Sequence, residues 1–174
     1  SAAIRSVSKT AYDVGSLDQM TSDLDPDPEM YAMTIAAALD SGIHLMLVFS
    51  TPAFCETATC GPQLDVLKGL KETYKTRANF IHIEVYDNPH EIQGDLSNAR
   101  ISPSLAEWNL PSELWTFVID GDGLVQAKFE GFATAQELND ALGTHGLRRL
   151  CCPPEGATLA VQGERIAECS FACH

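Results

Sequence analysis

A strand, a helix and a second strand in succession constrain the fold of this chain more than any other feature. Residues 43–49 are apolar almost throughout, which is typical of a strand covered on both faces of an α/β sheet. Between residues 64 and 74 the apolar positions follow one face of a helix, and residues 80–86 alternate as a strand does. The pattern predicts a βαβ unit, in which two parallel strands are joined by a right-handed crossover.

A β-hairpin and a helix are predicted after this unit. Residues 114–119 and 124–129 have the character of strands, and they flank residues 120–123 (Asp-Gly-Asp-Gly), which are typical of a hairpin turn. We therefore expect these two strands to pair antiparallel. Thr134 can cap a last helix that passes through Leu142.

Two short helices are predicted elsewhere in the chain. Thr34 can cap a helix over residues 35–39, with Gly42 at its end to adopt the left-handed conformation. The second short helix is predicted over residues 102–108, which have a Pro at their second position. Taken in order, the elements predict an α/β fold with a mixed central sheet of four or five strands and helices on both faces.

Shifts in composition divide the chain of 174 residues into three parts. Residues 1–28 are polar, acidic and interrupted by Pro, so we expect a flexible acidic N-terminal arm. Residues 29–146 contain all the predicted strands and helices, and a hydrophobic content of 45 % suits one globular core. Residues 147–174 form a Cys-rich C-terminal appendage.

Net charge and hydropathy exclude two classes of partner. The chain has 11 Lys and Arg against 24 Asp and Glu, and its net charge of −13 repels nucleic-acid phosphates and anionic membranes. The longest wholly apolar run, residues 45–49, is far shorter than the roughly 20 residues that span a bilayer. We expect no nucleic-acid partner and no membrane span.

The cysteine content indicates the compartment. Six Cys are more than a reducing cytosol usually tolerates without a metal or redox role, and the number is even, as full pairing requires. The first residues lack the apolar stretch of a secretory signal. We expect an extracytoplasmic protein, secreted or in the cell envelope, whose targeting segment is not part of this chain.

The order of the elements resembles the thioredoxin fold, and two motifs make the resemblance specific. At residues 49–55 (Phe-Ser-Thr-Pro-Ala-Phe-Cys) a buried strand ends in an aromatic residue and a Cys directly before a helix. Residues 62–67 (Pro-Gln-Leu-Asp-Val-Leu) are similar to the run that follows the redox Cys in thioredoxins. The resemblance covers roughly residues 34–145 and implies a three-layer sandwich with the sheet in the middle.

The resemblance also implies a thiol–disulfide oxidoreductase. Cys55 would be the attacking thiol, because a helix N-terminus stabilises a thiolate and lowers the thiol pKa from its free value of about 8.5. Cys60 would be its resolving partner. The implied partners are protein or small-molecule thiols and disulfides, and no organic cofactor is implied.

The spacing of this pair departs from the thioredoxin pattern, because four residues separate Cys55 from Cys60 where thioredoxins have two. Residues five apart in a regular helix have Cα atoms roughly 8.6 Å apart. A disulfide needs them within about 7 Å. If the two pair, either the helix begins late, with Gly61-Pro62 in its first turn, or its first turn unwinds on oxidation. Pro62 in a helix interior would cost about 3 kcal/mol, which favours the late start.

The spacing also resembles peroxiredoxins of the bacterioferritin-comigratory type, in which Thr-Pro precedes the peroxidatic Cys. Thr51-Pro52 is similar to that pattern, with one extra residue before Cys55. That family supplies an Arg just before the third strand, and Leu114 stands there in this chain. A thiol peroxidase needs such a cation. Thiol peroxidase is therefore the alternative function, and thiol–disulfide exchange is the leading one.

Two further residues are candidates for the site. Thioredoxin-like proteins place a cis-Pro before the strand that faces the redox Cys, but Leu114 occupies that position and the nearest proline is Pro111. Pro111 either serves through a local insertion or is a turn residue. Glu84 would lie centrally in the sheet, where a carboxylate can accept a proton near the thiols, or it points to a solvated edge.

A non-catalytic binding module is the third interpretation. Copper chaperones on this fold use two Cys and a distant His, so Cys55, Cys60 and His90 could hold a soft metal. In a binding module without metal, the Cys55–Cys60 disulfide would be structural. Solvated histidines are the more common explanation of a residue such as His90.

The C-terminal appendage contains the other four cysteines. If all six are oxidised and Cys55 pairs with Cys60, two bridges should join Cys151 and Cys152 to Cys169 and Cys173, because adjacent cysteines pair badly with each other. A zinc site is the alternative, but neither end has the two-residue spacing of a zinc knuckle.

Overall fold

The computed structural model describes residues 1–74, 76–111 and 113–144. The Cys-rich appendage expected at residues 147–174, with the four cysteines at 151, 152, 169 and 173, lies outside the described residues.

Four strands form one mixed sheet in the order β2-β1-β3-β4. The strands are β1 (His44–Ser50), β2 (Ala78–Glu84), β3 (Trp115–Ile119) and β4 (Val125–Glu130). β1 pairs parallel with β2 and antiparallel with β3, and β3 pairs antiparallel with β4. Both the predicted βαβ unit and the predicted hairpin are confirmed. β1 is a central strand, and its side chains from Leu45 to Ser50 are buried on both faces of the sheet, as its continuous apolar run indicates.

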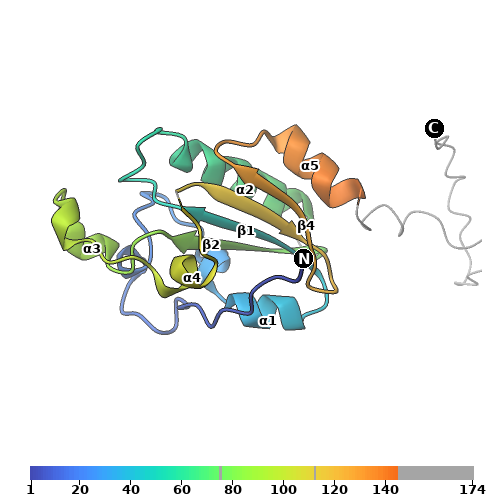
Figure 1. Cartoon of the computed structure of the whole chain (residues 1–174), viewed down its shortest axis with the longest axis horizontal. Helices are drawn as coiled ribbons and strands as arrows, with labels where there is room; N and C mark the ends of the chain where they lie inside the picture. Colours follow the sequence, from blue (N-terminus) through green and yellow to red (C-terminus); the bar gives the residue numbers. More distant parts are fainter. Residues whose placement is uncertain (75, 112, 145–174) are drawn as a thin grey trace, which may run out of the picture.

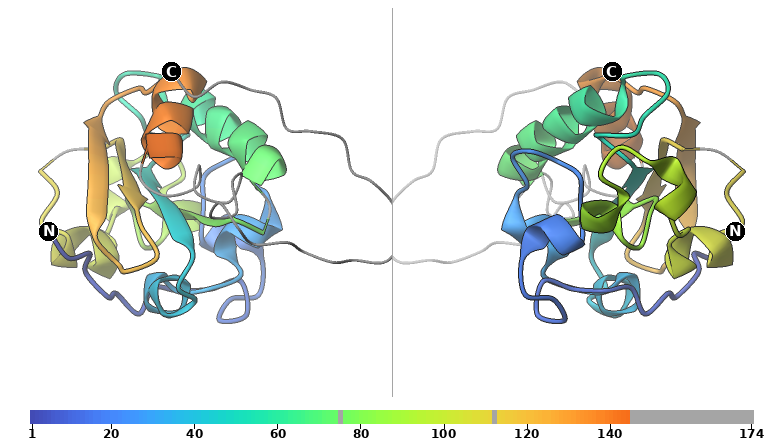
Figure 2. Two further views of the ribbon diagram at one scale, coloured as in Figure 1. Left: turned by 90° about the vertical axis from the view of Figure 1, so that its right-hand side faces the viewer. Right: turned by 90° about the vertical axis from the view of Figure 1, so that its left-hand side faces the viewer.

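Helices cover both faces of this sheet (Figure 1). The α-helices are α1 (Ile35–Asp40), α2 (Cys60–Tyr74), α3 (Pro89–Ile92), α4 (Pro103–Glu107) and α5 (Ala135–Thr144). Three short 3-10 helices are η1 (Leu17–Gln19), η2 (Pro28–Tyr31) and η3 (Leu96–Asn98). α2 and α5 lie on one face of the sheet and α1 and α4 on the other, so the predicted sandwich is confirmed (Figures 1 and 2).

The local signals that set the helix boundaries act as predicted. Thr34 caps α1 by accepting a hydrogen bond from the backbone N–H of Ala37, and Gly42 adopts a positive φ of 70° just after its end. Thr134 and Glu137 form a reciprocal capping box at the start of α5. Pro103 occupies the first position of α4, where its missing N–H breaks no helical bond.

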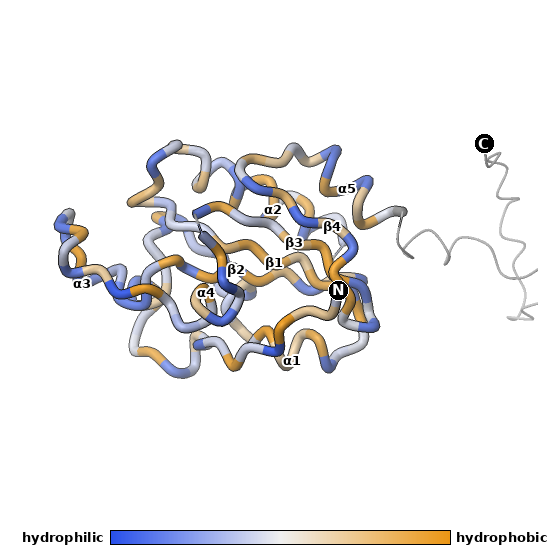
Figure 3. Tube along the Cα trace, viewed as in Figure 1, coloured by the Kyte–Doolittle hydropathy of each residue, from blue (hydrophilic) through white to orange (hydrophobic). Residues whose placement is uncertain are grey.

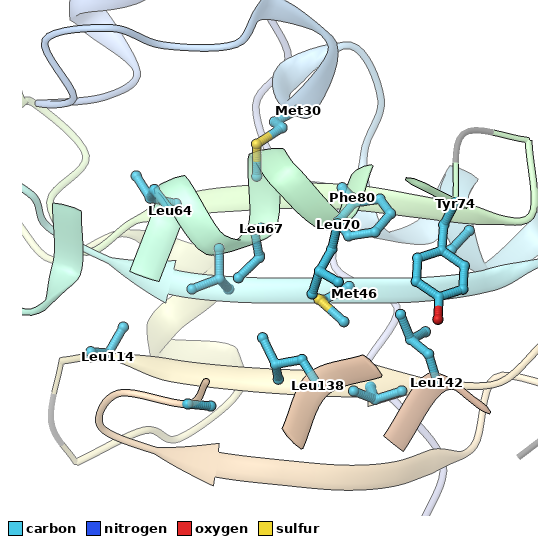
Figure 4. Packing of buried hydrophobic residues seen from close by; sticks show 14 of the residues in the cluster. Met30, Met46, Leu64, Leu67, Leu70, Tyr74, Phe80, Leu114, Leu138 and Leu142 are labelled. Atoms are coloured by element: carbon cyan, nitrogen blue, oxygen red, sulfur yellow. The ribbon is translucent and has the colours of Figure 1, made fainter. Parts of the chain in front are cut away.

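Two hydrophobic clusters fill the space between the sheet and its helices. The first contains Met46 and Val48 of β1 together with residues of α2 and α5, and Figure 4 shows it from close by. The second contains Leu47 and Phe49 of the same strand with Trp108 after α4. Alternate residues of β1 therefore belong to opposite layers, and the strand is hydrophobic along most of its length (Figure 3).

The first 28 residues lie against the domain, which differs from the flexible arm expected from their composition. The backbone N–H of Ala3 donates to Gly123 in the hairpin turn, and the buried hydroxyl of Ser6 accepts from the indole N–H of Trp108. Met30 and Tyr31 follow and are almost fully buried. A polar segment can pack in this way because its hydrogen bonds are satisfied by the domain and apolar side chains anchor its end.

Among the described residues, no helix is both long enough and apolar enough to cross a membrane.

Candidate active site

A loop of residues 51–59 connects β1 to α2 and contains the first cysteine of the pair. Cys55 and Cys60 form a disulfide with their Cα atoms 6.1 Å apart. Cys60 is the first residue of α2 and Pro62 lies in the first turn, so the late-starting helix is the correct solution for this oxidised form. The expectation that Cys55 stands directly before the helix is wrong, because residues 56–59 separate Cys55 from the start of α2. The two ends of the bridge differ in exposure, because Cys60 is fully buried while Cys55 is only half-buried.

Contacts with two other segments hold this loop. The backbone N–H of Ala53 donates to Ser22 Oγ at 3.0 Å, which ties the loop to the N-terminal segment. The ring of Phe54 packs edge-on against Tyr86 beyond the end of β2, with ring centroids 5.9 Å apart. Next to the disulfide, Cys55 Sγ lies 3.4 Å from the hydroxyl of Thr57. The accessible sulfur is therefore carried by a segment anchored on both sides.

Glu113 is the charged residue that the structure brings against the disulfide. One of its carboxylate oxygens and the sulfur atoms of Cys55 and Cys60 all lie within 4.8 Å of one another. Its Oε1 also accepts a 2.6 Å hydrogen bond from the backbone N–H of Glu56. Sequence reasoning missed Glu113. The available signal was its place directly before Leu114, the position that the resemblance puts opposite the redox Cys.

Leu114 has an unusual backbone conformation. It is 1 % exposed, packs in the same cluster as Cys60, and has a φ of 61°, in the left-handed region that costs an ordinary L-residue roughly 1–2 kcal/mol. Its carbonyl accepts a hydrogen bond from Gly131 N–H at 2.9 Å, which helps hold that conformation. The position therefore offers the site neither the proline of thioredoxins nor the arginine of the peroxiredoxin pattern.

Pro111 lies in the turn before Leu114 and is exposed. The peptide bonds of the described residues are all trans, that before Pro111 included. Pro111 borders a surface hollow together with Trp108 and Trp115. Its predicted catalytic role stays a prediction.

Glu84 is the last residue of β2, and β2 is an edge strand, so the expectation that Glu84 lies centrally in the sheet is wrong. The side chain is nevertheless only 4 % exposed, because the N-terminal segment covers it. Its Oε2 accepts hydrogen bonds from the N–H and the hydroxyl of Ser22, each at 2.8 Å. Burial raises the pKa of Glu84, and Ser22 also contacts Ala53, so the carboxyl connects through one side chain to the loop that carries Cys55.

Among the described residues, no histidine joins the two sulfurs in a cluster of potential metal ligands, as the copper interpretation needs. His90 is exposed and its Nε2 lies 3.9 Å from Glu91. His82 is buried, with its Nε2 2.9 Å from Ser50 Oγ and its Nδ1 2.8 Å from Tyr31 OH, and burial lowers its pKa to about 4. Within the described part of the chain, the third potential metal ligand beside the two sulfurs is Glu113.

Comparison with solved structures identifies the fold. The structure of MTB dsbF in mixed oxidized and reduced forms matches with a TM-score of 0.50 and 16 % identity over 64 % of this chain and 86 % of that one. A thiol:disulfide interchange protein of the thioredoxin family from Chlorobium tepidum TLS matches with a TM-score of 0.51 and 14 % identity over 72 % of this chain and 94 % of that one. No protein-family model matches the chain, and no curated protein does. The chain has the fold of the thioredoxin-like superfamily.

Proposed function

We propose that this protein is a thiol–disulfide oxidoreductase that uses Cys55 and Cys60 as its redox pair. The observation that carries the proposal is the disulfide itself, which joins a half-buried sulfur in a loop to a fully buried one at the start of α2. Such an arrangement gives the two sulfurs different roles, because a partner reaches the accessible sulfur and the buried one reacts only with its neighbour.

Exchange would run through a mixed disulfide. When the pair is reduced, the Cys55 thiolate attacks a substrate disulfide, and one substrate thiolate leaves. The Cys60 thiolate then attacks Cys55 Sγ, the second substrate thiolate leaves, and the Cys55–Cys60 bond forms, so that the substrate gains the two electrons that the pair loses. The reverse sequence oxidises a substrate dithiol. A distance of 6.1 Å between the Cα atoms suits both directions.

Two further residues are assigned roles in this proposal. Glu84 would be the buried proton acceptor of the site, because burial raises its pKa and Ser22 connects it to the loop that carries Cys55. Pro111 would contact a bound substrate segment, since it is exposed in the turn before Leu114.

The proposed partners are protein or small-molecule thiols and disulfides, and the proposed location is outside the cytoplasm. The disulfide between Cys55 and Cys60 and an even number of cysteines favour an oxidising compartment. The neighbour from Chlorobium tepidum is itself named a thiol:disulfide interchange protein.

Alkylation of Cys55 as a function of pH in a Cys60→Ala variant tests the proposal. The tryptic peptide of residues 10–68 has no cysteine outside this pair, so mass spectrometry of that peptide reports Cys55 alone. We expect reagents to alkylate Cys55 and a substrate disulfide to be trapped there as a mixed disulfide. The matched Cys55→Ala variant should trap none, because Cys60 is buried.

Other outcomes would select the alternatives. A Cys55 that reagents do not reach, or that traps no mixed disulfide, would contradict exchange and favour a structural disulfide. Rapid consumption of peroxide with a sulfenic acid at Cys55 would favour the thiol peroxidase.

A further inference from the structure

Three potential metal ligands from separate parts of the chain meet at the disulfide. Cys55 comes from the loop after β1, Cys60 from the first position of α2 and Glu113 from the loop before β3, and their ligand atoms lie within 4.8 Å of one another. Four residues separate the two cysteines, which falls within the spacing of two to four typical of zinc chelates.

We propose that the reduced pair binds a zinc ion through Cys55 Sγ, Cys60 Sγ and the Glu113 carboxylate, with water at the fourth position. The proposal rests on the proposed function in one respect, which is that the disulfide must be reducible. A dithiol reductant gives two electrons to the Cys55–Cys60 bond and becomes a disulfide itself. Binding of Zn²⁺ then releases the two thiol protons to solvent, and no further electrons move.

The chemistry of the ligands favours zinc over calcium, magnesium and copper. Two thiolates and one carboxylate suit a borderline cation, whereas calcium and magnesium take oxygen ligands and cuprous copper prefers sulfur and imidazole. His90, which a copper site would use, belongs to no such cluster among the described residues. The negative charge of the chain, −13 overall, also favours a divalent cation at an accessible loop.

Glu113 is already held in place for this role. The N–H of Glu56 donates to Oε1 of Glu113, which fixes the carboxylate beside the sulfurs before any ion arrives. Because zinc would occupy both sulfur atoms, metal binding and disulfide exchange exclude each other. Zinc would therefore act as a reversible inhibitor of the reduced form.

The experiment uses the full chain with Cys151, Cys152, Cys169 and Cys173 replaced by Ser, so that only one pair of thiols remains. The protein is reduced with a phosphine, desalted without oxygen and titrated with zinc against a chromophoric chelator. Cobalt provides a spectroscopic signature of thiolate ligation. We expect one zinc ion per chain in the reduced form and none in the oxidised form.

Two single variants identify the third ligand. Glu113→Gln should weaken zinc binding by about tenfold or more while the cobalt spectrum still shows two thiolates. His90→Ala is the matched control and should bind zinc as the parent does. Equal affinity in the parent and Glu113→Gln, or a loss confined to His90→Ala, would overturn the assignment of Glu113.

Failure of the zinc proposal is distinguishable from failure of the proposed function. Exchange is measured with a chelator present and then with excess zinc, and we expect zinc to abolish it. Exchange without stoichiometric zinc binding would overturn only the metal site. Zinc binding by a protein without exchange activity would contradict only the oxidoreductase.

Discussion

Leu114 shows how one residue can replace a family feature with a different local solution. The resemblance places a proline at this position, whose ring would fix φ near −65°. Leu114 instead has a φ of 61° and a side chain buried in the cluster that contains Cys60. Its packing offsets the cost of the left-handed conformation, since burying a Leu side chain contributes about 1.5–3 kcal/mol.

Leu114→Pro should therefore destabilise the protein although it restores the residue expected from the resemblance. The ring is incompatible with the observed φ, and the change also removes buried apolar volume, so we expect a loss of about 3 kcal/mol or more. Urea unfolding of the oxidised chain measures this loss. Leu114→Met, which keeps volume and backbone freedom, should cost less than about 1.5 kcal/mol. Similar midpoints for Leu114→Pro and the parent would refute the backbone argument.

Glu84→Gln tests the proton acceptor without changing the size of the side chain. Because only an ionised carboxyl accepts a proton, the exchange rate of the variant should fall furthest below the parent above the pKa of Glu84. The measurement is the pH profile of exchange with a small disulfide, and a several-fold reduction is expected. Glu107→Gln, at an exposed position of α4, serves as the control. If the pH profiles of the parent and Glu84→Gln are parallel, Glu84 is not the proton acceptor and only holds the loop in place.

The residues of the site differ in how far the sequence could predict them. Cys55 and Cys60 were predictable because their role follows from local order, a buried strand followed by a helix whose start Pro62 sets. Glu113 was not, because its contact with the sulfurs depends on how the loop before β3 packs beside the loop after β1. Periodicity and spacing do not encode such a tertiary contact, and the one available signal was the place of Glu113 directly before Leu114 in the resemblance.

At the scale of elements, β2 depends on the segment that precedes the domain. Its inward-facing polar residues both contact that segment: His82 Nδ1 lies 3.5 Å from Thr21 Oγ1, and Glu84 accepts a hydrogen bond from the hydroxyl of Ser22. The alternation of residues 80–86 predicted the strand correctly. It could not show that a polar segment of 28 residues would cover this edge, because low hydropathy indicates disorder unless specific partners satisfy the backbone.

The buried His82 predicts a loss of stability on acidification. Its pKa is lowered from 6.5 to about 4 because burial disfavours the imidazolium. Between these values the unfolded chain binds a proton that the folded chain does not, so the free energy of unfolding falls as the pH falls from about 6.5 to about 4. The contribution of one such group is at most about 1.4 kcal/mol per pH unit. Glu84 has a raised pKa and acts in the opposite direction.

Urea unfolding at several pH values, compared between the parent and two variants, isolates the effect of His82. The parent and His90→Ala should lose stability in parallel over this range, because His90 is exposed. His82→Gln should be less stable near neutral pH and should depend less on pH below about 6.5. If His82→Gln keeps the full dependence of the parent, another group is responsible.

At the scale of the whole molecule, the charge of −13 acts on every encounter with a charged substrate. Glu113 lies against the disulfide and Glu56 directly follows Cys55, so the local field at the accessible sulfur has the same sign as the net charge. Opposite charge accelerates diffusional encounter and like charge slows it. Chain composition therefore predicts a preference of the redox pair for cationic over anionic disulfides.

Cystamine, a dication, and dithiodipropionate, a dianion, measure this preference as oxidants of the reduced pair. We expect the ratio of their rate constants to fall several-fold between about 0.01 M and 1 M salt, as the Debye length shrinks from about 30 Å to about 3 Å. Hydroxyethyl disulfide is neutral and should react at nearly constant rate. Taking the ratio across salt concentrations removes the intrinsic difference between leaving groups. A ratio that does not change with salt would show that the field of the protein does not reach Cys55.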